Sequence, residues 1–190
     1  MAFVKIAKNQ SVKNVKKRSL TQNFALSVRR MKKRKAGGSL NPYRSALFLF
    51  GISLLVVVGD QLTKSLAIEF LRSRSSIPIV PNYFHLTFVE NSGIAFGWLD
   101  HHPQWLTVLI TLSVAALSIY AWYFRNQGRW QRLAYGFILG GAIGNWIDRL
   151  RYQHVIDFLD FRVWPVFNVA DSFITIGVML FVWFAIRGKS

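Results

Sequence analysis

Residues 133–150 read LAYGFILGGAIGNWIDRL. The first fifteen of them carry no charge, which approaches the roughly 20 mostly apolar residues that a membrane helix needs. Gly136, Gly140 and Gly144 recur every four residues, so they share one helix face, where a partner helix can approach the backbone closely. Asn145 and Asp148 follow at the end of the stretch. The stretch therefore predicts a membrane-spanning helix in a tightly packed bundle, with polar side chains at one end.

Three further apolar stretches have the length of a membrane helix. Residues 45–66, 105–124 and 166–186 join 133–150 as predicted spans, and hydrophobic residues make up 52% of the chain. The stretch 105–124 has no charge, and 45–66 has charges only at Asp60 and Lys64. Soluble domains are rarely this apolar and this basic together. The sequence therefore predicts a membrane α-helical fold with four transmembrane helices.

The region before the first span is strongly basic. Residues 1–43 contain no Asp or Glu, and the whole chain has a formal net charge of +16. Such an arm is typical of a topology signal, an anionic-lipid contact or a nucleic-acid-binding tail. Because it stops just before the first apolar stretch, we interpret residues 1–43 as a disordered cytoplasmic arm and residues 44–187 as the membrane domain. We expect no nucleic-acid partner.

The distribution of Lys and Arg predicts the orientation of the spans. The arm, the connection 125–132 and the tail are basic, so the positive-inside rule places both chain termini in the cytoplasm. With that orientation Asp60, Asp148, Asp157 and Asp171 all fall at the outer side of the membrane. A carboxylate at membrane depth costs about 2.5–3.5 kcal/mol even on the mildest scale, so each is a functional-site candidate.

The segment between the first two spans, residues 72–104, is expected to form a small β-sheet cradle on the outer face. Pro81 and Asn82 signal a turn, and residues 83–89 alternate as a strand does and are rich in aromatic residues. The cradle would lie beside the outer ends of the helices, where the acidic residues gather.

Two pairs of charged residues are predicted to be structural. Asp60 and Lys64 lie four residues apart, so they stack on one helix face with the acid first, the better order for an ion pair. Asp148 and Arg149 are neighbours, and we interpret them as an ion pair that locks the outer end of the third span. A pair that neutralises itself is a weaker candidate for catalysis.

Asp157 and Asp171 remain as the acids best placed for chemistry. Both lie among apolar and aromatic residues. Two carboxyls that lie close together cannot both ionise, so one pKa rises, and the pair can hold a water molecule between them. The ionised acid then deprotonates the water while the protonated acid polarises a carbonyl, which is peptide hydrolysis by general acid–base catalysis. On composition and spacing alone, a structural or transport role is nearly as well supported.

Other chemistries have weaker support. The chain has no Cys, no His-Glu-x-x-His, no Gly-x-Ser-x-Gly and no phosphate-binding loop. A Ser–Lys pair, of Lys64 with Ser92 or Ser172, is left open by the spacing. A small proton-coupled transporter is also left open, with Asp60, Asp148 and Asp171 as its relay, although these acids cluster at one face instead of crossing the bilayer.

Five sequence blocks, taken together, resemble the motif set of one protein family. In chain order they are Gly59-Asp60-Gln61-Leu62-Thr63-Lys64, Glu90-Asn91-Ser92-Gly93-Ile94-Ala95-Phe96-Gly97, Gly140-Gly141-Ala142-Ile143-Gly144-Asn145-Trp146-Ile147-Asp148-Arg149, Val155-Ile156-Asp157-Phe158 and Phe167-Asn168-Val169-Ala170-Asp171-Ser172. From about residue 45 to 186, the chain is thereby similar to lipoprotein signal peptidase, the type II signal peptidase of bacteria.

The resemblance implies a monomeric aspartic endopeptidase of the bacterial cytoplasmic (inner) membrane, with its active site at the outer, periplasmic face. It would act on prolipoproteins, cleaving just before the diacylglyceryl-modified Cys, in contact with membrane lipids and without a metal or other cofactor. By motif, the catalytic pair falls on Asp157 and Asp171, with Asp148 as the competing acid. Substrate-binding or supporting positions fall on Asn91, Gly93, Asn145, Arg149, Asn168, Asp148, Asp60 and Lys64.

Overall fold

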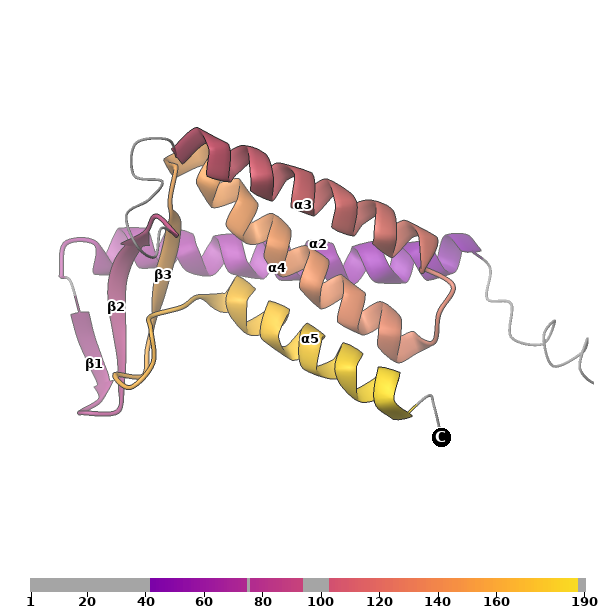
Figure 1. The fold of residues 1–190 in the computed structure, drawn as a ribbon. Helices are drawn as coiled ribbons and strands as arrows, with labels where there is room; N and C mark the ends of the chain where they lie inside the picture. Colours follow the sequence, from indigo (N-terminus) through magenta and orange to yellow (C-terminus); the bar gives the residue numbers. More distant parts are fainter. Residues whose placement is uncertain (1–41, 75, 94–102, 188–190) are drawn as a thin grey trace, which may run out of the picture. The chain divides into compact units, whose positions relative to one another are not determined.

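The computed structural model describes residues 42–74, 76–93 and 103–187, so the predicted arm falls almost wholly outside the described residues. Four helices and three strands make up the described part (Figure 1). In chain order they are α2 (Pro42–Leu71), β1 (Ser76–Val80), β2 (Phe84–Asn91), α3 (Pro103–Tyr123), α4 (Arg129–Tyr152), β3 (Val155–Asp160) and α5 (Val169–Arg187). The four apolar stretches are thus all helical, as predicted.

The helix α4 lies at the centre of the bundle and packs against α2, α3 and α5 (Figure 1). Tyr43–Leu71, Trp105–Tyr123 and Val169–Arg187 are long and apolar enough to cross a membrane. The sequence of α4 is more polar, with Arg residues near both of its ends and Asp148 near its C-terminus. Because its neighbours cover several of its faces, α4 does not need the uniformly apolar surface that lipid would demand.

Glycines allow this close packing. At Gly140 a Cβ would lie 2.7 Å from the backbone oxygen of Ser53, and at Gly136 it would lie 3.0 Å from that of Leu49, both on α2. Gly141 faces the other way, against the backbone of Ala170 at the start of α5. The predicted close approach of a partner helix to the glycine face of α4 is therefore confirmed.

The three strands form an antiparallel sheet in the order β1-β2-β3 at one end of the helices (Figure 1). The predicted turn at Pro81 and Asn82 and the strand after it are confirmed: Val80 pairs with Phe84, and Asn82 adopts a φ of 65° in the turn between them. The sheet rests on the end of α2, where Ala67 and Leu71 share a buried apolar cluster with Ile156 and Phe158.

The third strand was not predicted. We expected a sheet from residues 72–104 alone, but β3 comes from the connection between α4 and α5 and pairs with β2, so that Val89 lies opposite Asp157. In the strand sequence VIDFLD, five of the six residues are buried, so the strand lacks the alternation of a half-exposed one. The sharp turn into it occurs at Gln153, whose φ of 65° ends α4.

Candidate functional site

The last helix begins with a reciprocal cap that fixes Asp171. The side-chain oxygen of Asn168 accepts a 2.9 Å hydrogen bond from the backbone N–H of Asp171, and the backbone N–H of Asn168 points back to the Asp171 carboxylate at 3.4 Å. This is the arrangement of a capping box. It holds Asp171 in the first turn of α5, where the helix dipole favours a negative charge.

Asp157 lies on β3 and is only 1% exposed. Its carboxylate accepts a 2.7 Å hydrogen bond from the side-chain nitrogen of Asn91 on β2 and a 2.6 Å hydrogen bond from that of Asn168. Burial raises the pKa of Asp157 to about 6, and the charge of Asp171 adds to the rise, while the two Asn hydrogen bonds oppose it. This carboxyl therefore keeps a proton at a pH at which a free Asp is ionised.

Two asparagines connect the two acids. The side-chain nitrogen of Asn168 also donates a 3.0 Å hydrogen bond to the side-chain oxygen of Asn145. The side-chain nitrogen of Asn145 in turn donates a 2.7 Å hydrogen bond to Asp171. Asp157 and Asp171, which come from a strand and a helix, are thus linked through a continuous chain of amide groups.

A buried ionic cluster, formed by Lys64, Asp60 and Asp148, contacts these amides through Asn145. The Lys64 amino group lies 2.9 Å from Asp60 and 2.7 Å from Asp148, and it donates a 2.9 Å hydrogen bond to Asn145. Both ion-paired carboxyls are at most 1% exposed. The predicted ion pair between Asp60 and Lys64 is confirmed. One amino group thus lies between two buried carboxyls next to the candidate site.

This ionic cluster also fixes the backbone of the elements that carry the two candidate acids. Asp60 accepts a 2.9 Å hydrogen bond from the backbone N–H of Ala170 in α5, and Asp148 accepts one of 3.1 Å from that of Ile156 in β3. Gln61 donates a 2.9 Å hydrogen bond to the other oxygen of Asp148. Gln61 was not among the predicted site residues, and its only signal in the sequence was its place in the first of the five blocks.

The predicted ion pair between Asp148 and Arg149 is wrong. Consecutive helical residues do not face one another, and Asp148 pairs with Lys64 instead. The Arg149 guanidinium lies against Gly93, where a Cβ would come within 3.0 Å of Nη2, and the φ of Gly93 is 75°. Nη1 of Arg149 donates to the backbone oxygen of Asn145 at 3.3 Å, while its buried Nε has no hydrogen-bond partner among the described residues.

The structure does not support the Ser–Lys alternative. The Lys64 amino group is occupied by Asp60, Asp148 and Asn145, and the Ser172 hydroxyl donates to the backbone oxygen of Asn168 at 3.0 Å. Within the described residues, no three His, Asp or Glu side chains come together in a way that could hold a metal ion.

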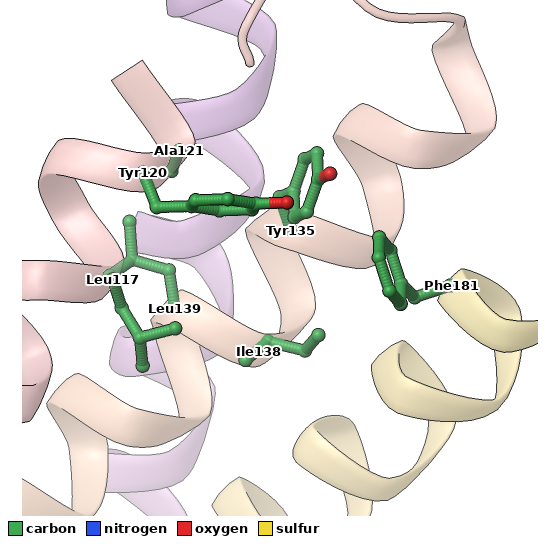
Figure 2. Close-up of a pocket in the computed structure, with 7 residues that line it drawn as sticks. All are labelled: Leu117, Tyr120, Ala121, Tyr135, Ile138, Leu139 and Phe181. Carbon is green, nitrogen blue, oxygen red and sulfur yellow. The ribbon is translucent and has the colours of Figure 1, made fainter. Parts of the chain in front are cut away.

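An apolar pocket of about 520 Å³ opens beside Asp171. Its other lining residues are Phe161, Trp164, Phe167, Ser172, Thr175 and Ile176. A second pocket, of about 370 Å³, lies between α3, α4 and α5, where the rings of Tyr120, Tyr135 and Phe181 border it (Figure 2). That second pocket contains none of the predicted site residues, whereas the first one joins apolar space to a candidate acid.

Comparison with known proteins gives a consistent result. The family model of signal peptidase (SPase) II matches residues 52–187. The lipoprotein signal peptidase of Halothermothrix orenii is 43% identical over 135 residues, which cover 70% of this chain and 92% of that protein. The corresponding protein of Burkholderia mallei is 40% identical over 161 residues, which cover 81% of this chain and 93% of that protein.

A solved structure of a bacterial membrane enzyme shares the fold. It superposes with a TM-score of 0.65 at 28% identity, covering 80% of this chain and 93% of its own. A second such structure gives a TM-score of 0.63 at 29% identity, covering 76% of this chain and 94% of its own. Together with the family model and the relatives, these matches establish that the chain belongs to the signal peptidase II family.

Proposed function

We propose that this protein is a lipoprotein signal peptidase that works as an aspartic endopeptidase with Asp157 and Asp171 as its catalytic pair. It cleaves a prolipoprotein just before the diacylglyceryl-modified Cys. The observation that carries the assignment is the amide chain through Asn168 and Asn145, because it holds two acids from separate elements together at one buried site.

The two acids have different roles because their surroundings differ. Asp171, at the start of a helix, is the ionised base that takes a proton from the attacking water. Asp157, whose pKa is raised to about 6 by burial, is the acid that protonates the carbonyl oxygen as the water oxygen bonds to carbon. When the C–N bond breaks, the leaving nitrogen takes the proton that Asp171 accepted, and one hydroxyl of the collapsing tetrahedral diol returns a proton to Asp157. No covalent bond to the enzyme forms.

The surroundings of the pair suit a lipid-modified substrate. The pocket beside Asp171 is lined mainly by apolar side chains, and it offers room for an apolar part of the substrate next to the base. Asp148, the competing second acid, suits the chemistry less well, because Lys64, Gln61 and the Ile156 backbone occupy both of its oxygens.

The membrane arrangement that fits this function has four spans, with α4 as the central one. Both termini then lie in the cytoplasm, and the sheet and the acid pair lie at the outer face of the cytoplasmic membrane. A prolipoprotein is anchored by its acyl chains in that outer leaflet, so its cleavage site reaches the same depth as the two acids. A monomer suffices for this activity, because the proposed site is assembled within one chain.

The test is cleavage of a diacylglyceryl-modified prolipoprotein by the purified wild type and by Asp157→Asn and Asp171→Asn, with folding checked for each. General acid–base catalysis by one group is worth about 10²–10⁴-fold in rate, so both variants are expected to lose at least that much. Asp160→Asn is the matched control: Asp160 is a buried acid on the same strand, and it binds Thr87 and Arg162 instead of the pair.

The outcomes separate the candidate acids. Activity in a folded Asp157→Asn variant, together with its loss in Asp148→Asn, would move the second acid to Asp148. A folded wild type that does not cleave the substrate would overturn the peptidase assignment itself. The transporter interpretation gains no support from the family match.

A further inference from the structure

Arg132, in the first turn of α4, is a buried cation without a counter-charge among the described residues. It is 7% exposed, and its Nη1 donates a 2.9 Å hydrogen bond to the hydroxyl of Ser45, which is fully buried on α2. Its guanidinium carbon lies 5.4 Å from the centre of the Phe48 ring. Within residues 42–74, 76–93 and 103–187, its buried Nε has no hydrogen-bond partner and none of the ion pairs involves Arg132.

The chain has no carboxylate side chain to offer at this end of the bundle. The start of α2 meets that of α4 here through the Arg132–Ser45 hydrogen bond, and the ends of α3 and α5 join them through the contacts of Tyr135 with Tyr120 and Phe181. Residues 1–59, 101–147 and 172–190 contain neither Asp nor Glu. The basic arm therefore cannot neutralise Arg132 with a side chain of its own, wherever it lies.

Other features make the immediate surroundings of Arg132 still more positive. Arg132 itself lies in the first turn of α4, and a helix N-terminus carries a partial positive charge whose effect is confined to about that turn. The Gly128 N-cap of α4 provides no side-chain hydrogen bond, and the first turn of α4 contains no acid. Arg44 and Arg129 add exposed charges. A buried charge that has no partner is strongly destabilising, so an external anion that reaches Arg132 would stabilise the folded protein.

We propose that Arg132 is the centre of a binding site for the phosphate of an anionic phospholipid headgroup in the cytoplasmic leaflet. A guanidinium matches the geometry of a phosphate group, and basic sites between membrane helices on the cytoplasmic side bind such headgroups. Beside Arg132, Leu47 and Phe48 are 76% and 43% exposed. In a membrane these apolar side chains face acyl chains, which a lipid brings and a free phosphate ion does not. The choice of the cytoplasmic leaflet rests on the proposed orientation, in which both chain termini lie in the cytoplasm.

The test uses the full-length protein, stripped of lipid in detergent, and measures binding of phosphatidylglycerol by native mass spectrometry and by the shift in thermal unfolding. Phosphatidylcholine and inorganic phosphate serve as parallel probes. The variants are Arg132→Gln and, as a matched control, Arg129→Gln, an exposed Arg one turn away. Arg132→Lys keeps the positive charge but loses the planar guanidinium that can bind phosphate through two parallel hydrogen bonds. It keeps the test decisive if Arg132→Gln folds poorly.

Phosphatidylglycerol should bind and stabilise the wild type and Arg129→Gln alike, while Arg132→Gln should bind it at least about tenfold more weakly, the value of one charged hydrogen bond. Arg132→Lys should fall between them. Equal binding by all variants, or a wild type that does not prefer phosphatidylglycerol to phosphatidylcholine, would overturn the proposal. If inorganic phosphate stabilises the wild type as much as phosphatidylglycerol does, the assignment of the anion to a lipid headgroup is wrong. Prolipoprotein cleavage in detergent should not change in Arg132→Gln, so this proposal and the proposed function fail independently.

Discussion

The side-chain nitrogen of Asn168 lies 2.6 Å from a carboxylate oxygen of Asp157, while its side-chain oxygen lies 2.9 Å from the backbone nitrogen of Asp171. One side chain thus holds one candidate catalytic acid directly and fixes the helix start that carries the other. The proposed contributions of Asn168 to catalysis and to stability thus come from different atoms of its side chain.

Replacing Asn168 by Ser or by Ala should separate these two contributions. Ser can still cap the helix, whereas Ala cannot, and loss of a cap costs about 1 kcal/mol. Both variants lose the amide donor to Asp157, so both should lose about 10²-fold in cleavage rate through misplacement of the acid pair. Denaturation and cleavage assays on the same preparations measure the two effects. An Asn168→Ser variant with full activity would show that the amide donor does not matter.

The stability of the protein should depend on the ionisation of Asp157. Its pKa in the folded state is about 6, above the ordinary value of 3.8, so the folded state binds more protons between these two values. The free energy of unfolding should therefore fall as the pH rises from about 4 to 6, by up to about 3 kcal/mol from this group.

Asp157→Asn removes the titrating group, so the comparison is between two pH profiles. The difference in unfolding free energy, variant minus wild type, should rise across that interval and then level off. Denaturant titrations in detergent at pH 4, 5, 6 and 7 give this difference directly. Parallel profiles for the two proteins would contradict a raised pKa at Asp157.

Two Gly→Ala substitutions should have opposite effects. At Gly140 a Cβ would meet the Ser53 backbone oxygen at 2.7 Å, and overpacking of this kind costs about 1–3 kcal/mol. At Gly51, in α2, nothing lies within 4 Å of the added Cβ, so Ala should be neutral or stabilise the helix by up to about 1 kcal/mol. Thermal unfolding of both variants measures this. A tolerated Gly140→Ala would mean that α2 and α4 can move apart at little cost.

The buried and the exposed ion pairs should differ greatly in their contributions. Lys64→Met leaves the buried carboxyls of Asp60 and Asp148 without their cation and should destabilise the protein by about 3–5 kcal/mol. Arg72 pairs with Glu90 at 3.5 Å, and these side chains are 67% and 43% exposed, so Arg72→Gln should cost less than about 1 kcal/mol. Similar losses in the two variants would show that water reaches the ionic cluster.

Deletion of residues 2–40 should leave prolipoprotein cleavage largely unchanged. Residues 41–190 form a compact unit, and all the proposed site residues lie within it. Each basic residue near an anionic surface adds about 1 kcal/mol of membrane attraction. The truncation should therefore weaken the binding of the protein to anionic vesicles instead of its activity. An inserted truncation that has lost its activity would give the arm a role in catalysis.

The helices could be predicted because each one is a long apolar stretch, but their ends could not be fixed as closely. The first helix continues past residue 66 to Leu71, since no residue in that interval interrupts a helix. The last one begins at Val169, later than the predicted residue 166, because the side chain of Asn168 caps it. Hydrophobicity does not report on caps, so it does not locate a helix start to within a few residues.

The contacts between the site residues were harder to predict than the identity of those residues. The five sequence blocks named the residues that meet, yet nothing local indicates that Lys64 reaches Asp148, which is 84 positions away in the chain but 2.7 Å away in space. Proximity in sequence misled us in pairing Asp148 with Arg149. The strand β3 was missed for a related reason, since its pairing with β2 is a long-range contact and its burial on both faces removes the usual pattern.

The third strand has a consequence for biosynthesis. A ribosome releases α2 and the β1–β2 hairpin early, but β3 emerges only after α4, and Asp171 emerges later still. The nascent chain therefore lacks the complete proposed pair of acids until its last helix has been made. A protease built in this order cannot cut its neighbours while it is still being made.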